Sequence, residues 1–147
     1  MIVATTPRKS RFEGSVDRTM TEDGAGTFEA FRRAEALVAQ RRPLDALAAL
    51  APVLDAEPDK PSVHLLAGRA YLGSAQLRRA EQAFLRVIEL DPTDHYARFA
   101  LGRTLQRLGR FPEAQTQLRI AAAMHPVPEY QEALGEVSAR IAVDRDR

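Results

Sequence analysis

Three histidines, His64, His95 and His125, are the side chains of this 147-residue chain best suited to bind a metal ion or to act as an acid or base near neutral pH. A metal ion needs three or four donors that converge on one point. The histidines instead follow one another at nearly even intervals, each about one internal repeat apart. We therefore expect them to lie on successive structural units, and we predict no metal site.

Other kinds of catalytic chemistry lack their residues. The absence of cysteine excludes disulfides, thiolate ligands and a thiol nucleophile. No phosphate-binding loop is present, and the glycines of the segment 23–26 do not follow a strand pattern as a dinucleotide-binding motif requires. Neither a paired set of carboxylates nor a nucleophile with its base is recognisable. We predict no cofactor, no catalytic residue and no enzymatic activity.

The charge balance points to no bulk electrostatic partner. The chain has 21 basic and 20 acidic residues, so no overall field draws it to nucleic acid or to an anionic membrane. No apolar stretch approaches the roughly 20 residues of a transmembrane helix, and no signal-peptide core follows the N-terminus. We expect a cytoplasmic protein. Only Lys9 and Lys60 among the basic residues are lysines, which is typical of a high-GC bacterial genome.

An internal repeat of 34 residues dominates the sequence. Small residues, large apolar residues and prolines each return at this interval without an insertion. The recurring sets are Ala46, Ala80 and Ala114; Leu50, Phe84 and Leu118; Val53, Val87 and Ala121; and Pro58, Pro92 and Pro126. The earlier part of each unit keeps residue size, with Ala34, Gly68 and Gly102 and then Leu37, Tyr71 and Leu105.

These positions have a physical reason. Two antiparallel helices approach closely only where a side chain is small, so a glycine in mid-helix indicates a close contact that offsets its cost of about 0.5–1 kcal/mol. Proline stops a helix because it lacks the N–H donor and clashes with the preceding turn. An unrelated helical bundle would not keep alanine and proline in phase three times.

The pattern resembles the tetratricopeptide repeat, a family with a 34-residue unit that has small residues where Gly68, Ala80, Gly102 and Ala114 lie and proline where Pro92 and Pro126 lie. The resemblance covers three units, 27–60, 61–94 and 95–128. The first unit diverges most, with Arg33 and Ala34 where leucine and glycine are commoner. The resemblance implies an all-α solenoid of three helix-turn-helix hairpins.

The two ends of the chain differ from the repeats. Residues 129–142 carry one apolar stripe and predict a capping helix, whose polar face, with Glu129, Glu132 and Glu136, we expect to face water. Residues 143–147 are charged, and we expect them to be frayed. Residues 1–26 show no period and predict a flexible tail, and Met20 is a possible alternative start of translation.

In the tetratricopeptide family the first helix of each hairpin lines a concave groove, so the resemblance implies a partner-binding site there. The residues it places in the groove are Phe28, Phe31, Arg32, Glu35, Leu65, Leu66, Arg69, Leu72, Tyr96, Phe99, Arg103, Gln106 and Arg107. Aromatic and arginine side chains are enriched in binding hot spots, and arginine grips carboxylates with two hydrogen bonds. Some of these aromatics could instead belong to the core.

We predict an adaptor that binds an apolar segment with acidic residues, and no nucleic acid or membrane. Family members that bind the acidic tails of heat-shock chaperones use lysines, asparagines and an arginine. The matching places here hold Phe31, Glu35, Leu66, Tyr96 and Ala100, which argues against such a chaperone adaptor. Two alternatives stay open: a self-assembling structural protein, and a small secretion chaperone of similar architecture.

Overall fold

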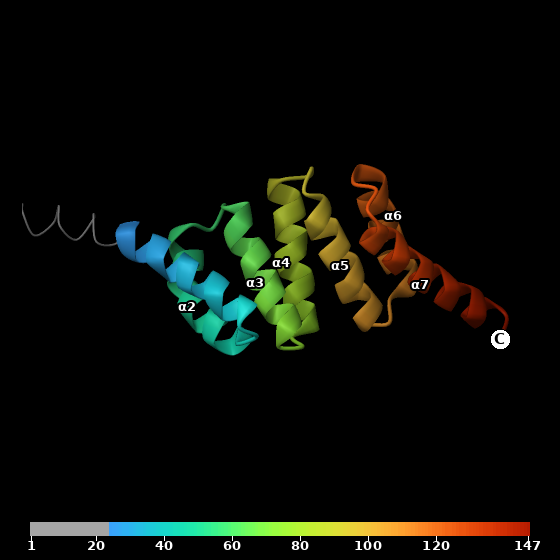
Figure 1. The fold of residues 1–147 in the computed structure, drawn as a ribbon, viewed down its shortest axis with the longest axis horizontal. Coiled ribbons are helices and arrows are strands. Elements are labelled where there is room, and N and C mark those ends of the chain that lie inside the picture. Colours follow the sequence, from blue (N-terminus) through green and yellow to red (C-terminus); the bar gives the residue numbers. More distant parts are fainter. Residues whose placement is uncertain (1–23) are drawn as a thin grey trace, which may run out of the picture.

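A row of antiparallel helices makes up residues 24–147, the part of the chain that the computed structural model describes. An N-terminal helix over residues 24–39 is followed by α2 (Pro43–Ala56), α3 (Pro61–Gly73), α4 (Leu77–Leu90), α5 (His95–Arg107), α6 (Phe111–Met124) and α7 (Pro128–Arg145). These residues contain no strand. Figure 1 shows the helices stacked along one axis with the C-terminus at the far end of the row. The predicted all-α solenoid is confirmed.

The helices at the two ends are longer than the sequence suggested. The N-terminal helix already includes residues 24–26, which the repeat pattern assigned to the tail. Helix α7 continues past the expected boundary at residue 142 as far as Arg145. The rest of the predicted N-terminal tail, and Met20 with it, lies outside the described residues.

The residues that recur every 34 positions form the core of each hairpin. The alanine, large apolar and valine or alanine sets that begin with Ala46, Leu50 and Val53 are all 0% exposed. Each lies on the second helix of its hairpin, facing the first. The recurring prolines follow the ends of α2, α4 and α6, where the chain turns into the next unit. The 34-residue repeat of the sequence therefore corresponds to one hairpin of the stack.

Two mid-helix glycines mark the closest helix contacts. A Cβ atom added to Gly68 would lie 2.5 Å from Cε1 of Phe84, and one added to Gly102 would lie 2.6 Å from Cγ of Leu118. Both distances are shorter than any ordinary carbon–carbon contact. Helices α3 and α4, and likewise α5 and α6, can pack at this separation only because these positions lack a side chain.

The three turns inside the hairpins share one backbone conformation. Arg41, Ala75 and Gly109, each 34 residues from the next, have φ values of 60°, 59° and 77°. The next residue in each turn donates its N–H to a carbonyl five residues back, for example Arg42 to Leu37 at 2.8 Å. This is the left-handed helix ending of a Schellman motif, which favours glycine. Only the third turn has glycine at that position.

The buried residues form two clusters rather than one. A smaller cluster joins the N-terminal helix and α2 to the face of α3 that includes Val63 and Leu66. A larger cluster joins α4, α5, α6 and α7, and includes Phe84 and Tyr130. Tyr71 packs against both. Helix α7 covers the end of the larger cluster.

Candidate functional site

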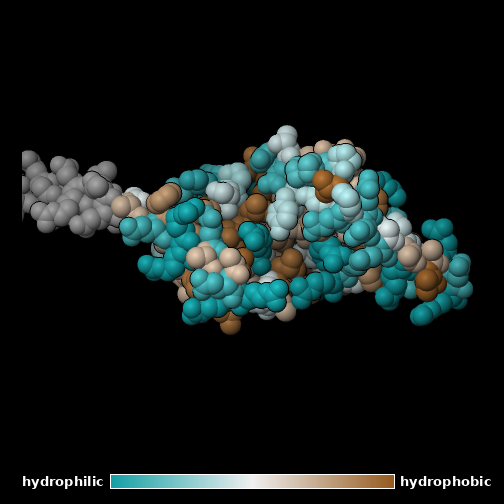
Figure 2. Space-filling view, in the orientation of Figure 1, coloured by the Kyte–Doolittle hydropathy of each residue, from teal (hydrophilic) through white to brown (hydrophobic). Residues whose placement is uncertain are grey.

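The first helices of the hairpins border a hollow of about 420 Å³ that is lined by apolar and arginine side chains. Its lining comes from the end of the N-terminal helix and the following turn, from the last turns of α3 and from both ends of α5. These residues are Val38, Arg41, Pro43, Arg69, Leu72, Gly73, Tyr96 and Arg107. In Figure 2, hydrophobic residues over the middle of the row lie between hydrophilic ones. We call this space the arginine hollow.

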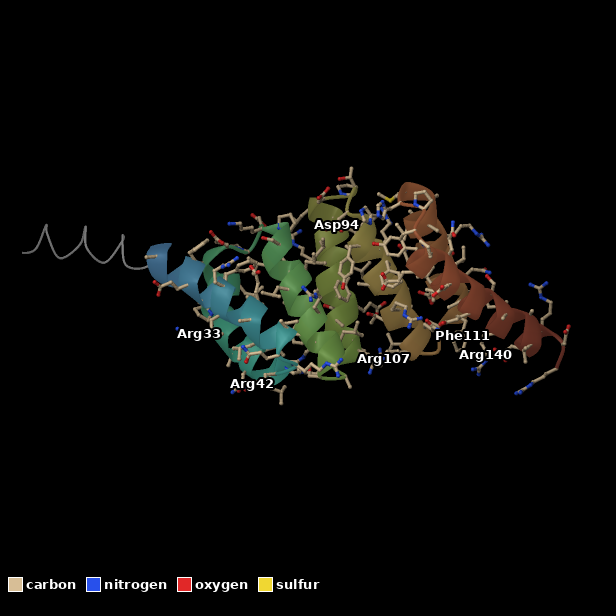
Figure 3. All side chains as sticks on the ribbon, in the orientation of Figure 1. Arg33, Arg42, Asp94, Arg107, Phe111 and Arg140 are labelled. Atoms are coloured by element: carbon tan, nitrogen blue, oxygen red, sulfur yellow. The ribbon has the colours of Figure 1, made fainter. Side chains whose placement is uncertain are left out.

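The guanidinium groups of the arginine hollow are largely free to accept a ligand. Within the described part of the chain, Arg41 and Arg69 make no ion pair and no side-chain hydrogen bond. Arg107 donates to the main-chain oxygen of Leu72 at 3.1 Å, a neutral acceptor that leaves its charge uncompensated. Figure 3 shows Arg107 at the lower end of α5. No carboxylate lines this hollow.

A second hollow, of about 380 Å³, continues the first toward α7. The two share Leu72 and Arg107, and the second adds Phe99, Arg103, Glu129, Glu132, Ala133 and Glu136. We call it the glutamate hollow, and the two hollows together the groove. The groove therefore crosses three helices, α3, α5 and α7.

An ion pair holds the glutamate hollow together across two helices. Arg103 on α5 donates to Glu136 on α7 at 2.9 Å and to Oε1 of Gln106 at 3.0 Å. The hydrogen bond from Arg103 is the main reason that the pKa of Glu136 is lowered, with a further hydrogen bond from Gln106. Arg103 is thus partly committed to α7 and less available to a ligand than Arg69.

Six of the predicted site residues from the second and third units line the groove: Arg69, Leu72, Tyr96, Phe99, Arg103 and Arg107. Phe99 is also 8% exposed and stacked on Tyr130 with ring centroids 4.5 Å apart, so it belongs to the core as well. Gln106 supports Arg103. Leu65 packs half-buried against the larger cluster, and Leu66 is a buried member of the smaller one.

The predicted residues of the first unit lie elsewhere. Phe28 and Phe31 line a separate hollow of about 210 Å³ with Glu57 and Lys60. Arg32 and Glu35 face each other at 3.9 Å on the surface. The first unit instead reaches the groove through the end of its first helix and its turn, at Val38, Arg41 and Pro43. The sequence did not indicate this because the helix orientation decides which of its two ends meets α3.

The glutamates of α7 are groove residues that the sequence reasoning placed elsewhere. Glu129, Glu132 and Glu136 are exposed, as expected of the polar face of a cap, but they also border the glutamate hollow. Their spacing of three and four residues puts them on one side of a helix, which was the available signal. The spacing does not reveal the packing angle between α5 and α7, which turns this side of α7 toward α5.

The expectation that the histidines lie apart on successive units is wrong for two of them. The rings of His95 and His125 stack with centroids 4.2 Å apart, and Nδ1 of His95 lies 2.9 Å from the hydroxyl of Tyr130. An antiparallel hairpin brings the start of α5 beside the end of α6, which explains the contact. His64 lies elsewhere, against the carbonyl of Pro58 at 2.7 Å. Among residues 24–147, no three metal-ligating side chains come together.

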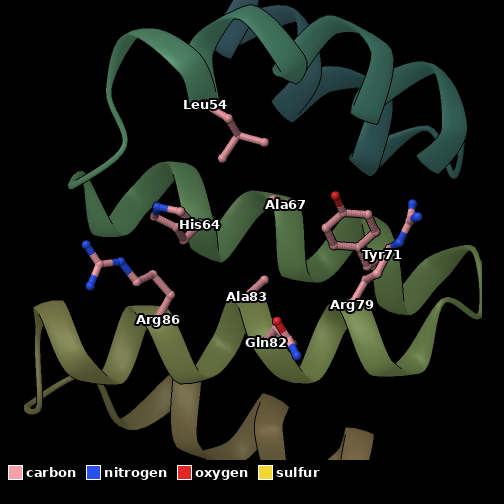
Figure 4. A pocket seen from close by; sticks show the side chains of 8 residues that line it. All are labelled: Leu54, His64, Ala67, Tyr71, Arg79, Gln82, Ala83 and Arg86. Atoms are coloured by element: carbon pink, nitrogen blue, oxygen red, sulfur yellow. The ribbon is translucent and has the colours of Figure 1, made fainter.

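A further hollow, which shares no lining residue with the groove, lies along α3 between α2 and α4 (Figure 4). It measures about 370 Å³ and includes His64, Tyr71 and Arg86, of which Arg86 pairs with Asp59 at 2.7 Å. Residues 34 positions later, including Leu101 and Leu105, line a hollow of about 280 Å³ between α4 and α6. Because the feature recurs in register, it follows from how successive hairpins stack.

Two further properties bear on function. No helix in the described range is long and apolar enough to cross a membrane. At the far end of the row, the guanidinium of Arg140 lies 4.7 Å from the ring centre of Phe111, so the cap is joined to α6 (Figure 3).

Comparison with known proteins gives matches to two models of the tetratricopeptide repeat, over residues 37–98 and 83–116. No curated protein matches the sequence. Among solved structures, the first such domain of Spaghetti (RPAP3), bound to the HSP90 peptide SRMEEVD, is 18% identical with a TM-score of 0.76, over 80% of this chain and 94% of that one.

Two other solved structures are similar to the same degree. The repeat domain of Sgt2 from Aspergillus fumigatus is 15% identical with a TM-score of 0.77, over 82% of each chain. MamA is 16% identical with a TM-score of 0.77, over 91% of this chain and 83% of that one. At such low identity the likeness shows a shared fold.

Proposed function

The chain belongs to the tetratricopeptide repeat family, and from that premise we propose that it is an adaptor that holds a segment of another protein in the groove. A module for protein interaction is what this fold generally provides, as in the Spaghetti domain with its bound peptide. The observation that carries the proposal is the arginine hollow, which is lined by three arginines and by apolar side chains and has no carboxylate in its lining.

Such a hollow suits an apolar segment that carries carboxylates. The lining residues Leu72 and Tyr96 offer apolar contact, while Arg69 and Arg107 can each donate two parallel hydrogen bonds to one carboxylate. Charge-assisted hydrogen bonds beside an apolar surface are stronger than those in open water. Tyrosine and arginine are also the residue types that dominate binding energy in interfaces.

The ligand is proposed to differ from chaperone tails. The places that match the chaperone clamp hold Phe31, Glu35, Leu66, Tyr96 and Ala100 in place of its lysines, asparagines and arginine, and Leu66 and Ala100 are each only 4% exposed. An apolar side chain there offers no donor to a terminal carboxylate. The basic charge of this groove lies instead on Arg41, Arg69 and Arg107, so it selects a differently placed acidic group.

Affinity capture tests this function directly. The full chain and the variants Arg69→Ala and Arg107→Ala are used as bait in lysate of the native organism, and captured proteins are quantified by mass spectrometry. Because both side chains are exposed, the variants are expected to fold, which circular dichroism verifies. We expect at least one protein to be lost from both variants and to be retained by Arg119→Ala, an exposed arginine on α6 outside the groove. An identical set of captured proteins from all four baits would refute the proposal that the groove binds the partner.

A further inference from the structure

Resting on the proposed function, we infer that the groove is dipolar and that its partner segment carries an acidic residue and a basic residue about five or six positions apart. The acidic residue lies in the arginine hollow, and the basic residue lies against the glutamates of α7. An all-acidic segment is the wrong ligand for this groove.

The α3 side of the groove supplies uncompensated positive charge. The arginine hollow contains three arginines and no acid. The side chains of Arg41, Arg69 and Arg107 are exposed, and none of them makes an ion pair with another described residue. A carboxylate there meets several guanidinium groups at once.

The α7 side supplies the opposite charge. Three glutamates, Glu129, Glu132 and Glu136, border the glutamate hollow with two arginines, Arg103 and Arg107, and of these only Glu136 and Arg103 form an ion pair, at 2.9 Å. Within residues 24–147, the carboxylates of Glu129 and Glu132 have neither an ion pair nor a hydrogen bond. A lysine or arginine from the partner would compensate them, whereas an acidic residue would be repelled.

The separation of the two charges follows from the helix packing. Arg69 lies on α3 and Glu132 on α7, with α5 between them. Neighbouring helix axes lie about 8–10 Å apart, so the two sides are about 16–20 Å apart. An extended chain advances about 3.3 Å per residue, which gives the interval of about five or six residues.

The shared lining makes one continuous ligand sufficient. Leu72 and Arg107 border both hollows, so a segment that crosses α5 meets the apolar side chain of Leu72 and the guanidinium of Arg107 between its two charged residues. The groove thus also fixes the direction of the segment, because reversing it would bring like charges together.

A random peptide library displayed on phage tests the inference with the full chain as bait. The charge reversals Arg69→Glu and Glu132→Lys are selected in parallel. Arg119→Glu on α6 and Asp55→Lys on α2 serve as matched controls, because both are exposed, lie outside the groove and lack an ion pair in the described chain. A representative enriched peptide and its charge-inverted copy are then synthesised for affinity measurement.

We expect wild-type peptides that carry an acid and a base at the stated interval. Peptides selected by Arg69→Glu should no longer be enriched in the acidic residue, and peptides selected by Glu132→Lys should no longer be enriched in the basic residue. Peptides selected by the two control variants should keep both. Each single charge reversal should lower the affinity of the protein for the synthetic peptide about tenfold, as expected when repulsion replaces an ion pair. The double variant should prefer the charge-inverted peptide.

The other outcomes separate the two proposals. Enrichment of uniformly acidic peptides, which bind Glu132→Lys more tightly, would overturn the dipolar ligand and leave the groove as the binding site. No enrichment, or enrichment indifferent to both reversals, would overturn both. If light scattering shows a wild-type dimer that both reversals dissociate, the occupant is a second copy of the chain, which overturns the inferred partner.

Discussion

Replacing Gly68 by alanine should destabilise the protein, although alanine is the better helix former. The added Cβ would lie 2.5 Å from Cε1 of Phe84 and 2.8 Å from its Cδ1 and Cζ. Phe84 is 0% exposed and the largest fully buried side chain in the described core. Because the ring is rigid and fully buried, we expect α3 and α4 to separate locally.

The magnitude follows from two opposing effects. Alanine gains about 0.8–1 kcal/mol over glycine from helix propensity. Overpacking a filled core costs about 1–3 kcal/mol, and here the clash is at the upper end because three ring atoms are closer than 3.0 Å. We expect a net loss of about 1–2 kcal/mol in the free energy of unfolding.

Gly135→Ala provides the matched control. Gly135 lies in the middle of α7, is exposed, and has no atom within 4 Å of an added Cβ. The same substitution should therefore stabilise the protein by up to about 1 kcal/mol. Urea unfolding followed by circular dichroism measures both variants, with a lower midpoint for Gly68→Ala and a higher one for Gly135→Ala.

A second substitution separates the clash from other causes. Phe84→Leu alone leaves a cavity, but combined with Gly68→Ala it should lose less stability than the sum of the single changes, because the new methyl group occupies part of that space. A Gly68→Ala variant as stable as Gly135→Ala would refute the close contact. Strict additivity with Phe84→Leu would assign the loss to something other than the ring.

Three further predictions concern the turns and the titrating groups. Ala75→Gly should raise the free energy of unfolding by about 0.5–1 kcal/mol, because φ is 59° at this position and glycine relieves the left-handed strain at some entropic cost. The midpoint of urea unfolding should rise accordingly. An unchanged or lower midpoint would contradict this. The pKa of Glu136 is lowered chiefly by its hydrogen bond from Arg103, so the ionised carboxylate stabilises the fold above the unfolded pKa of about 4.3, and this stabilisation is lost as pH falls through the folded pKa. The melting temperatures of wild type and Glu136→Gln should therefore converge in acid. A difference that stays constant with pH would contradict this role of Glu136. Burial raises the pKa of Tyr130, so the neutral phenol stabilises the fold below a pH of about 10, and this stabilisation is lost as pH rises through the folded pKa. The melting temperature of Tyr130→Phe should therefore fall less steeply with alkaline pH than that of wild type. An equal fall in both proteins would show that Tyr130 is not the titrating group.

The fold was predictable because each structural requirement repeats. Close helix contacts demand small residues, and Ala46, Ala80 and Ala114 stand in register and are all 0% exposed. The turns were harder to predict. Gly109 marks the third, whereas Arg41 and Ala75 adopt the same left-handed backbone without the residue type that would reveal it. Tertiary packing on both sides imposes that conformation there.

The groove was predictable only in part, since a helical stripe does not distinguish core from surface. Leu66 and Arg69 lie three positions apart on one helix, yet the first is 4% exposed and the second lines the arginine hollow. Arg107 and Tyr96, which the resemblance placed in a binding groove, line the arginine hollow, and their binding role stays a prediction. The missing contributors, such as Glu132, come from the cap, whose orientation depends on the packing angle between α5 and α7.

Tyr71 is the one partly buried side chain of the described residues that packs against both clusters, and the first hairpin meets the rest of the stack through the smaller cluster, at Val63 and Leu66 of α3. That hairpin can detach at a lower free energy than global unfolding, as expected when neighbouring repeats contribute separately. A ligand seated between Arg41 and Arg69 would contact both the first hairpin and α3 and so stabilise their junction. Occupancy would then be reported by slower amide hydrogen exchange in α2 beyond Pro43, in the part of the helix that does not line the hollow.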